Sequence, residues 1–332
     1  MLLRRAGLLL AVGVGASVGL AACGSCSSST AHSTTGGDAE GPTEPVVDPG
    51  PSPSHACQAY ATAFCGRLEA CTPFLLRAGY GDEATCAQRM AKGCLPALTA
   101  NGSQVTPSLM EACAAAIETQ TCDEALDNQQ PSACSVPGTL PMWAPCGVGS
   151  QCQTGYCNMT SGLCGSCVPR VGASAKCIVD TDCSATLVCH LGTCVGPGVA
   201  GAPCGTASPC MRTLTCIGAK CVAPVPEGGP CSAPTDCDGA HGGFCNPQTK
   251  TCVQTQMAAD GYPCGLVATD GGIIAVACAS GESCGRISPK GQGTCHPTAP
   301  DGALCGPDIA CLAPAVCSAT ARCTLPNPAF CQ

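Results

Sequence analysis

Aromatic residues are scarce in this sequence. Its 332 residues include four Phe, four Tyr and one Trp. Because aromatic side chains usually supply much of the apolar area that a folded core buries, a large conventional core is not expected. Charged residues make up only 11% of the chain, and acidic residues outnumber basic ones, 22 to 14, for a formal net charge of −8. A negative protein repels phosphate backbones, so the composition argues against a nucleic-acid partner.

Cysteine, glycine and proline are abundant instead. The chain has 36 Cys, 42 Gly and 29 Pro. Cysteine at this frequency is typical of a disulfide scaffold, and glycine and proline favour turns over long helices and strands. A native disulfide contributes roughly 2–4 kcal/mol to the free energy of unfolding, so a dozen or more can replace a missing core. Disulfides on this scale form in an oxidising compartment, which predicts export from the cytosol.

The N-terminus has the features of an export signal. Arg4 and Arg5 precede an apolar run that is short for a membrane-spanning helix and typical of a secretory signal. The run closes with the residues Leu20, Ala21, Ala22 and Cys23. These four residues resemble the bacterial lipobox, which is read by the lipoprotein signal peptidase. The resemblance implies that residues 1–22 are removed as a signal peptide and that Cys23 carries acyl chains, and several such chains give stable membrane anchoring.

Residues 23–54 separate this signal from the rest of the chain. They are rich in Ser, Thr, Gly and Pro, so we predict a disordered tether that holds the protein clear of a lipid surface. Gly24, in place of Asp, resembles the second residue of lipoproteins that are sorted to an outer membrane. Of the 36 cysteines only Cys23 and Cys26 precede residue 57, which leaves 34 in residues 57–331, an even number. We expect Cys26 to be unpaired, with a reactive thiol or an intermolecular bridge as the alternatives.

Residues 55–135 are predicted to form a helical cysteine-rich domain. Apolar side chains recur at helical spacing from Ala59 to Leu68, and Pro107 stands at a favoured first helical position. Helices are expected over about 59–68, after Asp82 and Glu83 to about Leu95 with an end at Pro96, over about 107–119, and from Asp123.

The cysteine spacing in this domain predicts two staples between helices. Cys57 and Cys65 are eight positions apart, as are Cys86 and Cys94, so each pair lies on roughly one helix face about 12 Å apart along the axis. Two antiparallel helices can then be joined by Cys57–Cys94 and Cys65–Cys86. The remaining cysteines, Cys71, Cys113, Cys122 and Cys134, are expected to close the other loops.

From residue 146 onward the cysteines follow a repeated rhythm. The first cysteine of each group of four falls at residues 146, 177, 204, 231, 264 and 305, and several groups open with a glycine-containing turn such as Gly201 to Cys204. Short strands such as 187–189 and 220–222 are expected to form ribbons that depend on disulfides, because a lone hairpin is marginal in water. We expect the first cysteine to pair with the third and the second with the fourth, which joins the opening turn to both strands. The expected pairs are Cys177–Cys189, Cys183–Cys194, Cys204–Cys216, Cys210–Cys221, Cys231–Cys245, Cys237–Cys252, Cys264–Cys284, Cys278–Cys295, Cys305–Cys317 and Cys311–Cys323.

The first two groups carry a more specific pattern. Residues 146–194 read C-x5-C-x4-C-x6-C-x2-C-x9-C-x5-C-x5-C-x4-C, with Gly155-Tyr156-Cys157 and Asp182-Cys183 among them. This resembles the Dickkopf N-terminal cysteine-rich domain, which we assign to residues 136–195, followed by further four-cysteine repeats over 196–331. The resemblance implies an extracellular recognition module built on disulfides; the receptor antagonism of animal Dickkopf proteins is not carried over. The family has adjacent cysteines where this chain has only Cys183, and the candidate for the cysteine left over is Cys167, with Cys331 as its partner.

Three further features each have two interpretations. Residues 265–277 are an insertion in the fifth group, expected to be an extra strand or a tolerated loop, with a binding loop as the alternative. Trp143, the sole tryptophan, is expected to pack at the junction before the first group, with a ligand platform as the alternative. Cys164 and Cys167 have the spacing of a zinc or redox pair, and in a secreted cysteine array they are expected to be halves of two disulfides.

No residue pattern points to catalysis. The five histidines show no HExxH or paired spacing, and a disulfide framework leaves little room for a nucleophilic thiol. We therefore predict no enzyme activity, no cofactor and no metal site.

Together these patterns predict small disulfide-rich modules in tandem, with short β-ribbons and little regular structure, preceded by a disulfide-stapled α-helical domain and a disordered tether. We expect a lipid-anchored protein of the bacterial cell envelope, at the outer membrane, with a binding, adhesion or structural role. Its expected partners are the membrane, through the N-terminal lipid, and a protein or glycan ligand. The alternatives are an inhibitor of an extracellular protease or receptor, an enzyme whose site is assembled from scattered residues, and a thiol-rich metal binder.

Overall fold

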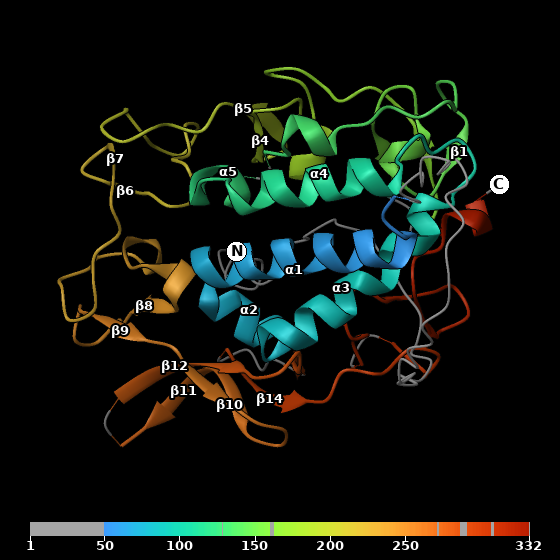
Figure 1. Ribbon diagram of the computed structural model, residues 1–332. Coiled ribbons are helices and arrows are strands. Elements are labelled where there is room, and N and C mark those ends of the chain that lie inside the picture. The colour runs from blue at the N-terminus through green and yellow to red at the C-terminus, as the bar shows by residue number, and fades with distance from the viewer. Residues whose placement is uncertain are drawn as a thin grey trace, which may run out of the picture.

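The structure is a computed structural model, and it describes residues 50–127, 129–159, 163–270, 272–285, 291–306 and 309–331. Within these residues five α-helices come first, and short strands, 3₁₀ turns and loops follow them (Figure 1). The described residues are cross-linked by 17 disulfides. The predicted disulfide-rich fold with short strands and little regular structure is confirmed.

The helices begin where the sequence encodes local start signals. Their bounds are α1 (Pro53–Cys71), α2 (Pro73–Tyr80), α3 (Glu83–Leu98), α4 (Pro107–Glu118) and α5 (Cys122–Leu126). Proline opens α1, α2 and α4, where its missing N–H is not needed. The side chains of Ser52, Asp82, Thr106 and Thr121 accept backbone N–H groups in the first turns of α1, α3, α4 and α5. Such caps satisfy donors that a helix start otherwise leaves unpaired.

Helix α1 lies between α3 and α4 and packs small side chains against both (Figure 1). The buried residues at the α1–α3 contact are mostly alanine and cysteine, with Met90 among the largest. Two disulfides join these helices, Cys57–Cys94 and Cys65–Cys86, with Cα–Cα distances of 5.3 and 5.9 Å. They are the two pairs that the helical spacing predicts.

Two features of the helical segment differ from the sequence prediction. Helix α3 continues past Pro96 to Leu98, because a proline in the last turn removes only one intrahelical bond and the carbonyl of Leu95 still accepts from Thr99. Helix α2 is not predicted at all. Its eight residues are too few for a clear periodicity, and the helix forms because Phe74 and Leu76 are buried. The remaining disulfides of this segment are Cys71–Cys122 and Cys113–Cys134.

Six four-cysteine units follow the helices, and each opens with the same backbone turn. We number them 1 to 6 by their first cysteines, at residues 146, 177, 204, 231, 264 and 305. The residue three positions before each first cysteine has a φ between 67° and 81°: Trp143, Ser174, Gly201, Gly228, Gly261 and Gly302. In all six units its N–H donates to the carbonyl of the unit's last cysteine, as Gly201 does to Cys221 at 2.8 Å. This position corresponds to the third residue of a type II turn, which favours glycine.

Two crossed disulfides hold each unit together. In units 2 to 6 the first cysteine pairs with the third and the second with the fourth, in the ten pairs that the repeat predicts. In unit 1 the corresponding pairs are Cys146–Cys157 and Cys152–Cys167. The sulfur atoms themselves form the core: in unit 4 the buried cluster consists of its four cysteines, with Val225 packed against it.

The strands of the units are short, and all pair antiparallel except β10 (Gln256–Ala258) with β12 (Gly272–Cys278), which pair in parallel. The third and fourth disulfide-forming cysteines of each unit stand opposite each other, as Cys216 and Cys221 do. Unit 1 has three strands in the order β1 (Pro145–Cys146), β3 (Gly165–Cys167), β2 (Cys157–Asn158). The two-stranded ribbons are β4 (Val188–His190) with β5 (Thr193–Val195), β6 (Thr215–Ile217) with β7 (Lys220–Val222), β8 (Gly243–Cys245) with β9 (Cys252–Gln254), and β15 (Val316–Cys317) with β16 (Cys323–Thr324).

Unit 5 contains the insertion, and there it forms extra strands. Its sheet has the order β10 (Gln256–Ala258), β12 (Gly272–Cys278), β11 (Pro263–Thr269), β14 (Gln292–His296), β13 (Ser283–Gly285). The start of β12, which β10 does not reach, is held by unit 4: the Asn246 amide donates to the carbonyl of Ile273 at 3.0 Å, and the N–H of Ile273 donates to Gln248 at 2.9 Å. The insertion is therefore part of a sheet rather than a loose loop.

The first loop of units 1, 2 and 4 is closed by one side chain. The residue before the second cysteine is Gln151, Asp182 or Asp236, and its side-chain oxygen accepts the N–H groups of the two residues after the first cysteine. Asp182 also accepts the Tyr156 hydroxyl at 2.5 Å, which joins unit 2 to unit 1. Burial, together with this bond to a carboxylate, raises the pKa of Tyr156 to about 12.

The units pass around the helices and return to where they started (Figure 1). Ribbons β4/β5, β6/β7 and β8/β9 and the unit 5 sheet follow one another around the helices, and the C-terminus lies beside β1. Thr72 donates to the carbonyl of Ala240 in unit 4 at 3.0 Å, and Gln151 of unit 1 donates to the carbonyl of Asn101 at 2.8 Å. The helices thus form a hub to which the units are bonded.

The disulfide Cys164–Cys331 closes this circuit, and it corrects the sequence prediction for Cys331. It links unit 1 to the C-terminal 3₁₀ helix η6 (Pro328–Cys331) across 167 residues. Cys167 pairs with Cys152 instead, because it lies in β3 opposite Cys157 and so takes the place of the fourth cysteine of unit 1. The additional cysteine of the unit is therefore Cys164.

Candidate functional site

The predicted lipid attachment site lies outside the described residues. Leu20, Ala21, Ala22 and Cys23 all precede residue 50, as do Cys26 and most of the predicted tether. The signal peptide, the acylated cysteine and the disordered tether therefore stay predictions.

Each cysteine that the structure describes takes part in a disulfide. Several sets of three sulfur atoms lie within 4.8 Å of one another, for example those of Cys231, Cys237 and Cys245. These sets arise because the two disulfides of a unit cross closely. A metal ligand or a nucleophile has to be a thiolate, so cysteines in this bonded state serve as neither.

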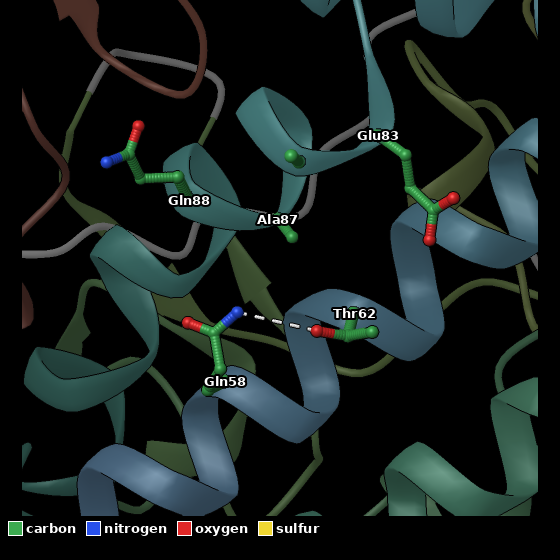
Figure 2. Close-up of a pocket in the computed structure, with 6 residues that line it drawn as sticks. Gln58, Thr62, Glu83, Ala87 and Gln88 are labelled. Carbon is green, nitrogen blue, oxygen red and sulfur yellow. Dashed lines mark hydrogen bonds between the residues drawn. The ribbon is translucent and has the colours of Figure 1, made fainter.

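A shallow open groove of about 460 Å³ runs between α1 and α3 (Figure 2). Its lining residues are Gln58 and Thr62 from α1 and Glu83, Ala84, Ala87 and Gln88 from α3. In Figure 2 the Ala87 side chain points toward α1, with Gln58 and Thr62 across from it. The Gln58 amide donates to the Thr62 hydroxyl at 3.4 Å, so both side chains are held at the groove.

The chemistry of the groove fits a neutral hydrogen-bonding ligand. Two amides, one hydroxyl and one carboxylate surround a floor of alanine, and none of the lining residues is basic. Amides and hydroxyls can both donate and accept, and the alanine methyl groups offer a small apolar contact. A sugar ring has this combination of hydroxyl groups and C–H faces, whereas an anion would meet Glu83 without a compensating charge.

Asp127, which follows α5, is buried against unit 3. Its side chain is 1% exposed; Oδ1 accepts the N–H of Arg212 at 3.3 Å and lies 3.7 Å from the Arg212 Nε, while Oδ2 has no hydrogen-bond partner in the described structure. Burial raises the pKa of Asp127 to about 6, against the lowering effect of Arg212 and with further increases from Asp123 and Asp180. The Arg212 guanidinium also bonds Asp180, so one cation is shared by two carboxylates.

Replacing Asp127 with asparagine is expected to stabilise the protein at pH 7.5 by about 1–2 kcal/mol, because a neutral amide removes the cost of burying a charged carboxylate. Because the folded state holds the pKa of Asp127 above its ordinary value, the wild-type protein loses stability as the pH rises from about 4 to 7. Urea unfolding at pH 5 and pH 7.5 measures this difference, which D127N should reduce. The control is D260N, at an exposed acid of unit 5. Equal pH dependence in wild type and D127N would contradict the assignment.

Three of the histidines that the structure describes, His55, His190 and His241, lie in separate elements and bond different partners. His55 on α1 lies 2.7 Å from Glu111, and His241 lies 2.9 Å from Asp238, both at exposed positions. His190 bonds the carbonyl of Thr206 at 2.8 Å, which joins unit 2 to unit 3. None of the four histidines that the structure describes lines the groove between α1 and α3.

Sequence reasoning missed both the groove and the buried carboxylate. Nothing near Asp127 marks it as buried, since its partner Arg212 is 85 residues further along the chain. The small residues Ala84 and Ala87 on one face of α3 are a signal for close helix packing, but the same spacing is common in ordinary helices.

Comparison with protein-family models, with curated proteins and with solved structures finds no significant match to this chain. Among the helices that the structure describes, none combines the length and the apolar character that a membrane span requires. Function therefore has to be inferred from the chemistry of the residues and from the geometry.

Proposed function

We propose that this chain is an exported lipoprotein of the bacterial cell envelope with a binding, adhesion or structural role. Cys23 carries the lipid, residues 24–54 form the tether, and the disulfide-linked residues that follow are a rigid body that presents a binding surface. The observation that supports this most strongly is the pairing of all 34 cysteines from Cys57 to Cys331. Such pairing requires an oxidising compartment, which exported bacterial proteins reach and cytosolic ones do not.

We infer further that units 1 to 6 are tandem modules of a Dickkopf-like kind and that residues 55–135 form a helical domain before them. The shared opening turn, with a positive φ at the same position in all six units, supports the modules. The two staples between α1 and α3 support the helical domain. A scaffold of this type resists extracellular proteases and heat because its unfolded state is tightly restricted.

The groove between α1 and α3 supports a neutral glycan as the ligand of this body. Its amide, hydroxyl and carboxylate groups can bond sugar hydroxyls, and the floor around Ala87 offers an apolar contact for a ring face. The absence of a basic residue among the lining residues and the chain's net charge of −8 disfavour acidic ligands.

Mass measurement of the N-terminal peptide tests the anchor. The full chain is expressed in a bacterial host fed with a clickable fatty acid, and the isolated protein should begin at Cys23 and carry label. Cys23→Ala should abolish labelling and leave residues 1–22 attached, because no thiol remains to accept the lipid. Cys26→Ala is the matched control and should be labelled like the wild type. An unlipidated N-terminus at another residue would refute the proposal.

A further inference from the structure

Trp143 occupies the turn position that is glycine in four of the six units. Its φ of 70° lies in the left-handed region, which is sterically unfavourable for a bulky aromatic residue. The other five units form the same turn and the same hydrogen bond to the last cysteine with glycine or serine at this position. The fold therefore does not require a tryptophan there.

The rest of the chain does little to compensate for this strain. Trp143 is 70% exposed and Met142 before it is 50% exposed, so the sequence expectation that Trp143 packs at a junction is wrong. A second aromatic residue, Phe330, is 65% exposed and lies in η6, which contacts β1 (Pro145–Cys146), the strand that begins two residues after Trp143. Large exposed apolar side chains that gather in one region mark a surface that contacts something else.

These side chains lie at the end of the molecule where the described chain begins. Cys57, near the start of α1, is bonded to Cys94 near the end of α3, and α3 contacts η6. Figure 1 shows the start of α1, strand β1 and the C-terminus at this same end. The segment that leads from Cys23 therefore joins the folded residues at the end of the molecule where β1 and η6 lie.

We propose that Trp143, Met142 and Phe330 form a surface that contacts the bilayer to which Cys23 is attached. This inference depends on the lipid anchor of the proposed function. Tryptophan favours the membrane–water interface because its ring is apolar and its N–H is polar. A coil of the length of residues 24–49 spans on the order of 30 Å, so the anchor keeps this end of the protein close to the lipid.

The contact is apolar rather than electrostatic. The chain is acidic, with a formal net charge of −8, so attraction to anionic headgroups does not supply the binding energy. Binding of this end to the bilayer should accordingly be insensitive to salt. It also orients the molecule, with the opposite side of the helical hub and units 3 and 4 directed away from the membrane (Figure 1).

Tryptophan fluorescence tests this orientation, because Trp143 is the sole tryptophan of the chain. The processed, acylated protein is reconstituted into vesicles of phosphatidylethanolamine and phosphatidylglycerol. Emission should shift to shorter wavelength, quenching by aqueous acrylamide should fall roughly two-fold, and lipids brominated near the glycerol should quench it. Emission that stays as in water, in protein shown to be acylated and vesicle-bound, overturns the inference and leaves the proposed function intact.

Two variants separate this surface from general proximity to lipid. Trp143→Phe combined with Tyr262→Trp moves the indole to an exposed position of unit 5, where bromolipid should not quench it. Met142→Ser with Phe330→Ser should reverse the Trp143 shift without removing the lipid. The mass of the N-terminal peptide is measured in each sample. A peptide without an acyl chain overturns the proposed function and, with it, the proposed lipid-contacting surface. A wavelength shift in lipid-free protein that also doubles in mass would instead assign the surface to a second copy of the chain, and would overturn the inference.

Discussion

Reduction of the native protein with excess dithiothreitol is expected to unfold it across all the described residues. Loss of one disulfide removes roughly 2–4 kcal/mol, and a folded protein has only about 5–15 kcal/mol in reserve, so loss of a few pairs suffices. The buried clusters of units 1 and 4 consist of their four cysteine side chains, and that of unit 6 adds only Ala299 and Ala315 to its cysteines. Size-exclusion chromatography should show a larger hydrodynamic radius. The backbone amides of the six opening turns should lose their protection from hydrogen exchange.

The controls for this experiment are the unreduced protein treated with iodoacetamide alone and a count of reactive thiols. Alkylation without reduction should leave the radius unchanged, because none of the described cysteines has a free thiol. A protein that keeps its radius and its exchange protection after all its cysteines have been reduced and alkylated would show that buried apolar packing, rather than sulfur, holds the fold.

Replacing Arg89 with alanine is expected to lower the free energy of unfolding by about 3–5 kcal/mol. Arg89 on α3 is 6% exposed, and its two Nη atoms donate to the two carboxylate oxygens of Asp301 at 2.7 Å each. The same guanidinium donates to the carbonyls of Ala313 and Leu312 at 2.9 Å. Without it the Ala313 carbonyl loses the guanidinium donor and the Leu312 carbonyl keeps only the N–H of Ala315. The Asp301 carboxylate then keeps only the 3.5 Å contact with Lys92 Nζ. Urea unfolding measures the decrease in the free energy of unfolding. Hydrogen exchange should show faster exchange of the backbone amides in residues 299–325.

Lys92→Ala is the matched control, because Lys92 Nζ lies 3.5 Å from the same carboxylate but is more exposed. A pair of this kind contributes about 0–1 kcal/mol. Hydrogen bonds from Arg89 and its charge hold the pKa of Asp301 below its ordinary value. The ion pair therefore stabilises the protein above about pH 4, and its contribution is lost as the pH falls through the lowered pKa, a dependence that R89A should remove. Equal losses in R89A and K92A would contradict the central role of Arg89.

Local spacing accounts for the disulfides within units and between the two stapled helices. Cys57 and Cys65 face α3 together because eight residues are a little over two helical turns, and the same holds for Cys86 and Cys94. Within a unit, the pairing follows from the ribbon, because the third and fourth cysteines stand opposite each other and each reaches back to the first loop. These relations involve at most a few tens of residues, so periodicity and turn chemistry suffice to predict them.

Contacts between distant parts of the chain could not be predicted from local spacing. Cys164 and Cys167 are equivalent candidates from spacing alone, and only the register of β3 against β2 shows that Cys167 belongs to unit 1 and that Cys164 is left for Cys331. The Arg89–Asp301 pair spans 212 residues, and neither residue stands in a distinctive pattern. Helix α2 escaped prediction because its formation depends on burial of Phe74 rather than on its own periodicity.

The amino-acid sequence by itself determined that this protein is built on sulfur cross-links and turns, because those depend on cysteine spacing and on residues that constrain φ. Only the tertiary structure decided that the units encircle the helices, that Cys331 closes the ring through Cys164, and that Trp143 stands exposed where the folded residues begin. The physical reason is that the direction in which one unit leaves the next is set by side-chain bonds between units, such as Tyr156 to Asp182, and small changes of angle add up around the ring.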